Sequence, residues 1–116
     1  MAIELNEAAL RHARALVREG KVVRDERDAW SATAPTPDEE NHFIEREGWT
    51  AYAHWHLGVD PDENPETKQA YSFPFGDFRK VRRSGVIAGE HRAGQYDHDE
   101  IEAALKGLLE LIDAGG

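Results

Sequence analysis

The C-terminal end of the sequence carries an uninterrupted helical pattern that constrains the fold more than any other feature. Apolar residues recur there at the spacing that places side chains on one face of a helix: Ile101, Ala104, Leu105, Leu108, Leu109 and Ile112. Asp97 and Glu100 precede this stripe at the spacing of a capping box, and Tyr96 is placed to staple to Ile101. The sequence therefore predicts a C-terminal helix that is capped by Asp97 and buries its apolar face.

Two other helices have clear boundary signals. Asn6 is a favourable N-cap and Gly20 suits the position after a helix end, which predicts a helix over residues 6–19. Thr36 and Glu39 form a second capping box, and Gly48 ends that helix. Weaker patterns predict a short helix that ends near residue 70 and a long helix from residues 82–84 to about residue 94.

The segments between the helices are predicted to be extended or mobile. Residues 21–35 combine charged and small residues, which is typical of a mobile linker. Residues 71–80 hold three phenylalanines, a proline and a glycine, and we expect them to form an extended aromatic arm across the core. The chain of 116 residues has the size of one domain. We predict a single, mainly α domain of four to five helices with one or two short extended segments.

Composition narrows the cellular setting. The chain has no cysteine, which excludes disulfides and thiolate metal sites and favours a reducing compartment. Its first residues lack the basic and apolar regions of a signal peptide, and no apolar run approaches the roughly 20 residues that span a bilayer. We expect an acidic, cytoplasmic protein without a membrane partner.

A dense basic cluster interrupts this acidic chain. The net charge is −9, yet residues 79–96 hold five basic side chains and one acidic one. If Ser84 caps a helix, the backbone N–H groups of the first helical residues, beginning with Gly85, are free and form an anion site. This site would lie beside the basic cluster of Arg79, Lys80, Arg82 and Arg83. Phosphate or nucleic-acid binding is one interpretation. The other, which we favour, is that nearby carboxylates pair with most of these cations.

Aromatic residues form a second candidate surface. The set comprises Trp49, Tyr52, Trp55, Phe75 and Phe78. We interpret these side chains as part of the core of a small domain. The alternative is that they form an exposed patch that binds a partner or a ligand.

Histidines and carboxylates suggest a weak candidate metal site. His42 and Glu45 are three residues apart on the second predicted helix, a spacing that can hold one metal ion. His54 and His56 would share a face only on a strand. No specific metal-binding signature is present in the sequence. We therefore favour the interpretation that these histidines lie at the surface and bind no metal ion.

Part of the chain resembles known sequences of phage origin. The stretches are WHLGVDPDENPETK (residues 55–68) and YSFPFGDFRKVRRSGVIAGEHRAGQYDHDEIEAALKGLLELID (residues 71–113). They resemble small, uncharacterised bacterial and phage-encoded helical proteins, and are similar to an accessory segment that accompanies phage head-maturation proteases. The resemblance implies a structural or accessory module and transfers no catalytic residue.

These observations favour an interaction protein over an enzyme. The three serines lie outside any nucleophile motif, and no phosphate loop or dinucleotide fingerprint is present. We therefore expect a non-enzymatic module without a cofactor that binds a protein partner or a second copy of itself. The alternatives are an anion- or nucleic-acid-binding module and a metal-binding protein.

Overall fold

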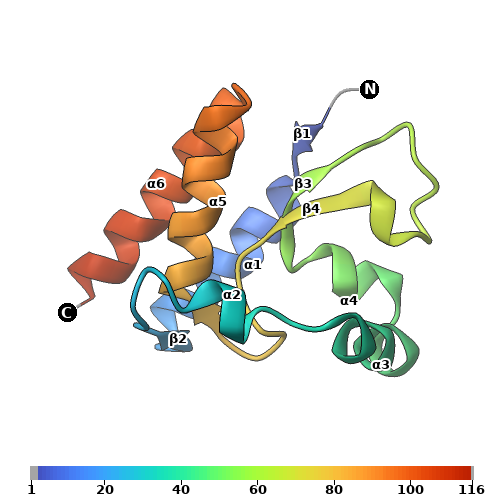
Figure 1. Cartoon of the computed structure of the whole chain (residues 1–116), viewed down its shortest axis with the longest axis horizontal. Helices are drawn as coiled ribbons and strands as arrows, with labels where there is room; N and C mark the ends of the chain where they lie inside the picture. The colour runs from blue at the N-terminus through green and yellow to red at the C-terminus, as the bar shows by residue number, and fades with distance from the viewer. Residues whose placement is uncertain (1–2, 116) are drawn as a thin grey trace.

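Figure 1 shows the computed structural model of the chain, which describes residues 3–115. The long helices begin and end close to the predicted positions. The described helices are α1 (Glu7–Arg18), α2 (Trp30–Thr33), α3 (Pro37–Glu47), α4 (Trp49–Ala53), η1 (Lys68–Ala70), α5 (Arg83–Gln95) and α6 (Asp99–Ala114). The strands are β1 (Glu4–Leu5), β2 (Val22–Val23), β3 (His56–Val59), β4 (Tyr71–Pro74) and β5 (Val81–Arg82).

Local capping chemistry explains the boundaries of the first helices. The Asn6 side chain accepts a hydrogen bond from the Ala9 N–H at 3.3 Å, as predicted for the cap of α1. After α1, Gly20 has a φ of +78°, and its N–H donates to the carbonyl of Val17. Both bonds of the capping box between Thr36 and Glu39 are present at α3. These signals act within four residues, so the sequence shows them directly.

The start of α6 differs from the prediction. Asp97 has a φ of +59°, and its N–H donates to the carbonyl of Gly94 while the N–H of His98 donates to that of Ala93. This is the hydrogen-bond pattern that closes a helix at its C-terminus, so Asp97 ends α5. His98 then takes the N-cap position of α6 without a side-chain hydrogen bond. Tyr96 is 60% exposed, so the predicted staple does not bury it.

The prediction of a mainly α fold is wrong. β1, β3 and β4 form an antiparallel sheet with β3 in the centre, and β2 pairs in parallel with β5. In the first sheet His56 lies opposite Pro74 and Gly58 opposite Ser72. The strands have two to four residues each, which is too short for a visible alternation. The chain is one domain of mixed α and β structure.

The two irregular segments also contain regular structure. The predicted linker at residues 21–35 holds β2 and α2, and its mobility stays a prediction. The first half of the predicted aromatic arm is β4, so its extended conformation is correct. The second half is a turn in which the Asp77 carboxylate accepts hydrogen bonds from the N–H groups of Arg79 and Lys80.

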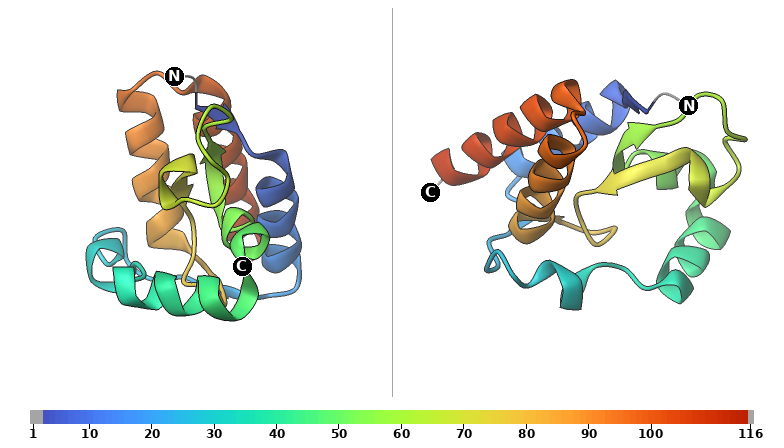
Figure 2. Two further views of the ribbon diagram at one scale, coloured as in Figure 1. Left: turned by 90° about the vertical axis from the view of Figure 1, so that its right-hand side faces the viewer. Right: turned by 45° about the horizontal axis from the view of Figure 1, so that its top comes forward.

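The core lies between the three-stranded sheet and the surrounding helices. α5 and α6 lie side by side, α1 packs against α6, and α3 and α4 lie at the other end of the molecule (Figures 1 and 2). Gly89 permits the close approach of α5 to α6, because a Cβ at this position would lie 3.0 Å from Cδ1 of Leu105. Among residues 3–115, no helix has the length and apolar character needed to cross a membrane.

Candidate binding groove

Two of the four cations of the basic cluster, Arg82 and Arg83, pair with carboxylates within the protein. Arg82 contacts two carboxylates, with Nε 3.0 Å from Oδ2 of Asp77 and Nη1 3.4 Å from Oδ2 of Asp25. Arg83 forms a two-pronged pair with Asp113, at 2.8 and 3.2 Å. The hydrogen bond from Arg83 lowers the pKa of Asp113, and this exposed pair contributes little to stability. Burial alone would raise the pKa of Asp77, but the hydrogen bonds that it accepts outweigh burial and lower its pKa.

An internal anion occupies the start of α5. Ser84 is fully buried; its N–H donates to Oδ1 of Asp25 at 2.9 Å and its hydroxyl donates to Oδ2 at 2.8 Å. The N-cap position belongs to Arg82, so the prediction that Ser84 caps this helix is wrong. The reason is tertiary: a carboxylate from the segment before α2 binds the free N–H end of α5. The predicted external anion site is therefore filled by the protein itself.

The remaining members of the predicted anion site have other surroundings. Arg79 and Lys80 are exposed, and only their backbone N–H groups bind Asp77. Gly85 faces the Trp30 ring, because a Cβ at Gly85 would lie 2.9 Å from Cζ3 of Trp30. Trp30 can therefore pack closely against α5 because Gly85 has no side chain.

The predicted aromatic patch is mostly core. Tyr52, Trp55 and Phe75 are buried, while Trp49 and Phe78 are partly buried. Trp55 and Phe75 stack with ring centroids 5.5 Å apart, and their packing is internal. These residues stabilise the domain, and Tyr52, Trp55 and Phe75 offer almost no surface to a partner.

The candidate metal residues do not converge. His42 and Glu45 are exposed on α3, while His56 is buried at the start of β3. Nδ1 of His56 lies 2.8 Å from the carbonyl oxygen of Tyr52, and burial lowers the pKa of His56 to about 4. Within residues 3–115, no group of three or more potential ligands has the geometry to hold a metal ion. Metal binding by these residues and His54 remains a prediction without support from their positions.

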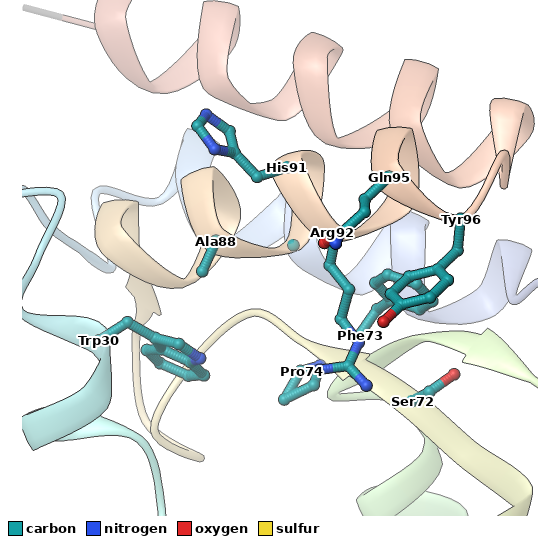
Figure 3. Close-up of a pocket in the computed structure, with 10 residues that line it drawn as sticks. Trp30, Ser72, Phe73, Pro74, Ala88, His91, Arg92, Gln95 and Tyr96 are labelled. Atoms are coloured by element: carbon teal, nitrogen blue, oxygen red, sulfur yellow. The ribbon is translucent and has the colours of Figure 1, made fainter.

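A groove lies between α2, β4 and α5 among the described residues. Figure 3 shows its lining, and its volume is about 520 Å³. The lining residues are Trp30, Ser72, Phe73, Pro74, Ala88, Gly89, His91, Arg92, Gln95 and Tyr96. We refer to it as the α2–β4–α5 groove. It combines apolar and aromatic surface with a few polar groups, which is typical of binding sites.

The rim of the groove carries one arginine, Arg92, and no carboxylate is among the residues that line the groove. The Arg92 guanidinium lies over the Tyr96 ring, 5.9 Å from its centroid. Among the described residues, Arg92 has no carboxylate within ion-pair distance, unlike Arg82 and Arg83. Nε2 of His91 lies 3.1 Å from Nη2 of Arg27. Among the described residues, Arg92 is thus a cation without a carboxylate partner beside the groove of an acidic protein.

The floor of the groove contains a strained residue. Phe73 has a φ of +59° within β4, a conformation that is rare for a bulky residue and that costs about 1–3 kcal/mol. Gly58 makes room for it on the neighbouring strand, because a Cβ there would lie 2.8 Å from Cδ2 of Phe73 and would also meet Oγ of Ser72. Strain of this kind occurs most often at functional sites, which supports the groove as a site of function.

Only partial signs of this groove are present in the sequence. Trp30 lies in the segment interpreted as a linker, and Arg92 lies within the basic stretch of residues 79–96 but outside the predicted anion site. Tyr96 was assigned to helix capping. The clue in the sequence was an aromatic residue four positions after an arginine on one helix face. Nothing local indicates that Trp30 and β4 meet this face.

Comparisons of the chain with protein-family models, curated proteins and solved structures found no match. The resemblance to phage-related segments therefore stays a prediction, and the argument for function rests on the groove.

Proposed function

We propose that this protein is a non-enzymatic interaction module that binds an extended segment of a partner protein in the α2–β4–α5 groove. The observation that carries this proposal is the exposed pairing of Arg92 and Tyr96 beside an open apolar groove. Arginine and tyrosine are enriched among the residues that dominate binding energy at interfaces. The absence of cysteine fits action in the cytoplasm.

The shape and chemistry of the groove favour an extended peptide. Aromatic side chains at both ends and Pro74 in the floor form an apolar path of the kind that receives extended, proline-containing segments. Figure 3 shows the Trp30 ring nitrogen on the side that faces Pro74, where its N–H can donate to a peptide carbonyl. Arg92 at the other end supplies a partner for a carboxylate. The expected ligand therefore combines an apolar or proline residue with an acidic one.

A displayed library of random linear peptides tests this proposal. We expect the selected peptides to be enriched in proline and acidic residues and to shift the NMR signal of the Trp30 indole N–H. Arg92→Glu should weaken their binding at least about tenfold, because it replaces the carboxylate partner with a like charge. Tyr96→Ala should weaken binding by several-fold while leaving the fold intact, since Tyr96 is exposed.

Arg14→Glu is the matched control, because Arg14 is an exposed arginine on α1, away from the groove. It changes the net charge as Arg92→Glu does, so a general charge effect would weaken binding equally in both variants. The proposal is wrong if the selected peptides bind Arg92→Glu and Tyr96→Ala as tightly as the unmodified protein.

A further inference from the structure

The loop between β3 and η1 is an acidic protrusion. Asp62 and Glu66 are exposed in it, next to the exposed rings of Pro61 and Pro65. We refer to residues 60–66 as the acidic loop. Figure 1 shows that it projects from the end of the three-stranded sheet, away from α5. It thus presents carboxylates and prolines together, the two features that the α2–β4–α5 groove favours.

Hydrogen bonds hold the acidic loop in one shape. The Asp60 side chain accepts from the N–H of Asp62 at 3.0 Å, and the Asn64 side chain accepts from the N–H of Glu66 at 2.9 Å. Tyr71 in β4 donates its hydroxyl to the carbonyl of Pro65 at 2.7 Å. A loop that is already ordered loses little conformational entropy on binding, which favours recognition.

We propose that the acidic loop of one copy of this protein docks into the α2–β4–α5 groove of a second copy. This inference rests on the proposed function and names one occupant of the groove, a loop of turns that offers proline next to carboxylate in place of an extended segment. The loop cannot reach the groove of its own chain, because its hydrogen bonds fix it at the far end of β4. The contact therefore joins two different surfaces, head to tail, and allows either a closed ring or an open chain of copies.

Charge supports the contact locally and weakens it at long range. The carboxylates of Asp62 and Glu66 meet Arg92, which has no carboxylate partner among residues 3–115. Two copies, each with a net charge of −9, also repel one another. At about 0.15 M salt the screening length is about 8 Å, so this repulsion is largely removed while the close contact persists. We expect weak association, with a Kd of hundreds of micromolar, as for small transient interfaces.

Analytical ultracentrifugation of the full chain tests the inference. The average mass should rise with protein concentration up to about 1 mM, in the range where a weak contact of this kind becomes populated. Arg92→Glu and the double variant Asp62→Lys/Glu66→Lys should each lower the association constant at least about tenfold. Arg14→Glu matches the charge change of Arg92→Glu, and the double variant Glu45→Lys/Glu110→Lys matches that of the loop variant. These control substitutions lie at exposed sites on α1, α3 and α6 and should leave association unchanged.

Mixing the two variants gives the decisive measurement. The Arg92→Glu protein keeps an intact acidic loop, and the loop variant keeps an intact groove, so one native contact is possible only between them. We expect each variant alone to be monomeric and the mixture to form a complex of one copy of each. This complementation also shows that both variants are folded.

Two results would overturn the inference. If the unmodified protein is monomeric up to about 1 mM, or if its association survives both sets of substitutions, the acidic loop is not the occupant of the groove. The proposed function would then still stand if selected peptides bind at Trp30 and Arg92. If the protein associates through loop and groove but no library peptide binds there, the proposed function fails in favour of self-recognition alone.

Discussion

Replacement of Asp25 by alanine should convert the start of α5 from a filled anion site into an open one. Asp25 accepts hydrogen bonds from the N–H and the hydroxyl of Ser84 and forms an ion pair with Arg82. All three partners lose an acceptor in Asp25→Ala. Arg82 keeps Asp77, so the main loss is at Ser84.

The cost of Asp25→Ala follows from these contacts. Loss of the carboxylate at the helix N-terminus removes a capping interaction worth about 0.5–2 kcal/mol. The Ser84 hydroxyl is buried without access to water, and a buried group that lacks its partner costs about 1–3 kcal/mol. We expect the free energy of unfolding to fall by about 2–4 kcal/mol, a large share of the stability of a domain this size.

Urea unfolding, followed by tryptophan fluorescence, measures this change. A double-mutant cycle with Ser84→Ala separates the two contributions, because the alanine has no hydroxyl to leave unpaired. Asp25→Ala should cost at least about 1 kcal/mol less in the Ser84→Ala background than in the unmodified protein. Additive effects of the two substitutions would refute the direct link between Asp25 and the Ser84 hydroxyl.

Phosphate provides a second readout. Inorganic phosphate should raise the melting temperature of Asp25→Ala more than that of the unmodified protein, because the free N–H groups of α5 then face an open site. The comparison at equal ionic strength with sodium chloride removes general salt effects. Equal stabilisation of both proteins by phosphate would refute the idea that Asp25 fills this site.

Two further predictions concern the core and the floor of the groove. The pKa of His56, about 4 in the folded protein, lies below its ordinary value of 6.5, so the unfolded chain binds the proton first and stability falls as the pH drops from about 6.5 towards 4. Urea unfolding should show a loss of about 2 kcal/mol by pH 5 from this group, and His56→Asn should remove that part of the pH dependence; identical slopes in both proteins would contradict it. Gly58→Ala places a methyl group against Phe73 and Ser72 and should lower the free energy of unfolding by about 1–3 kcal/mol. The same variant should weaken peptide binding in the groove. An unchanged melting temperature would contradict the prediction, because β3 and β4 would then accommodate the methyl group without loss of stability.

Much of the helical structure could be predicted because its signals are local. The caps at Asn6 and Thr36 and the stripe that includes Leu105 involve residues within a few positions of one another. The fold class could not be predicted, since strands of two to four residues carry no pattern of their own. Asp97 shows the limit of local signals: its position suits a cap of α6, but the tight connection between two packed helices uses it to end α5.

The candidate site depends even more on tertiary structure. The sequence showed a basic cluster at residues 79–83 and suggested that carboxylates would pair with it. Only the fold revealed that Asp25, 59 positions from Ser84 along the chain, fills the helix terminus. Likewise, only the fold brings Trp30, which packs on Gly85, and β4 together to line the groove.

The sequence by itself determined where the long helices lie, how acidic the chain is and where its cations gather, because caps, periodicity and charge depend on neighbouring residues alone. The tertiary structure decided which cations remain available. It paired Arg82 and Arg83 with carboxylates and left Arg92 beside an open aromatic groove. The physical reason is that the neutralisation of a charge depends on distances between segments that are remote in the chain, and these distances are fixed only when the core packs.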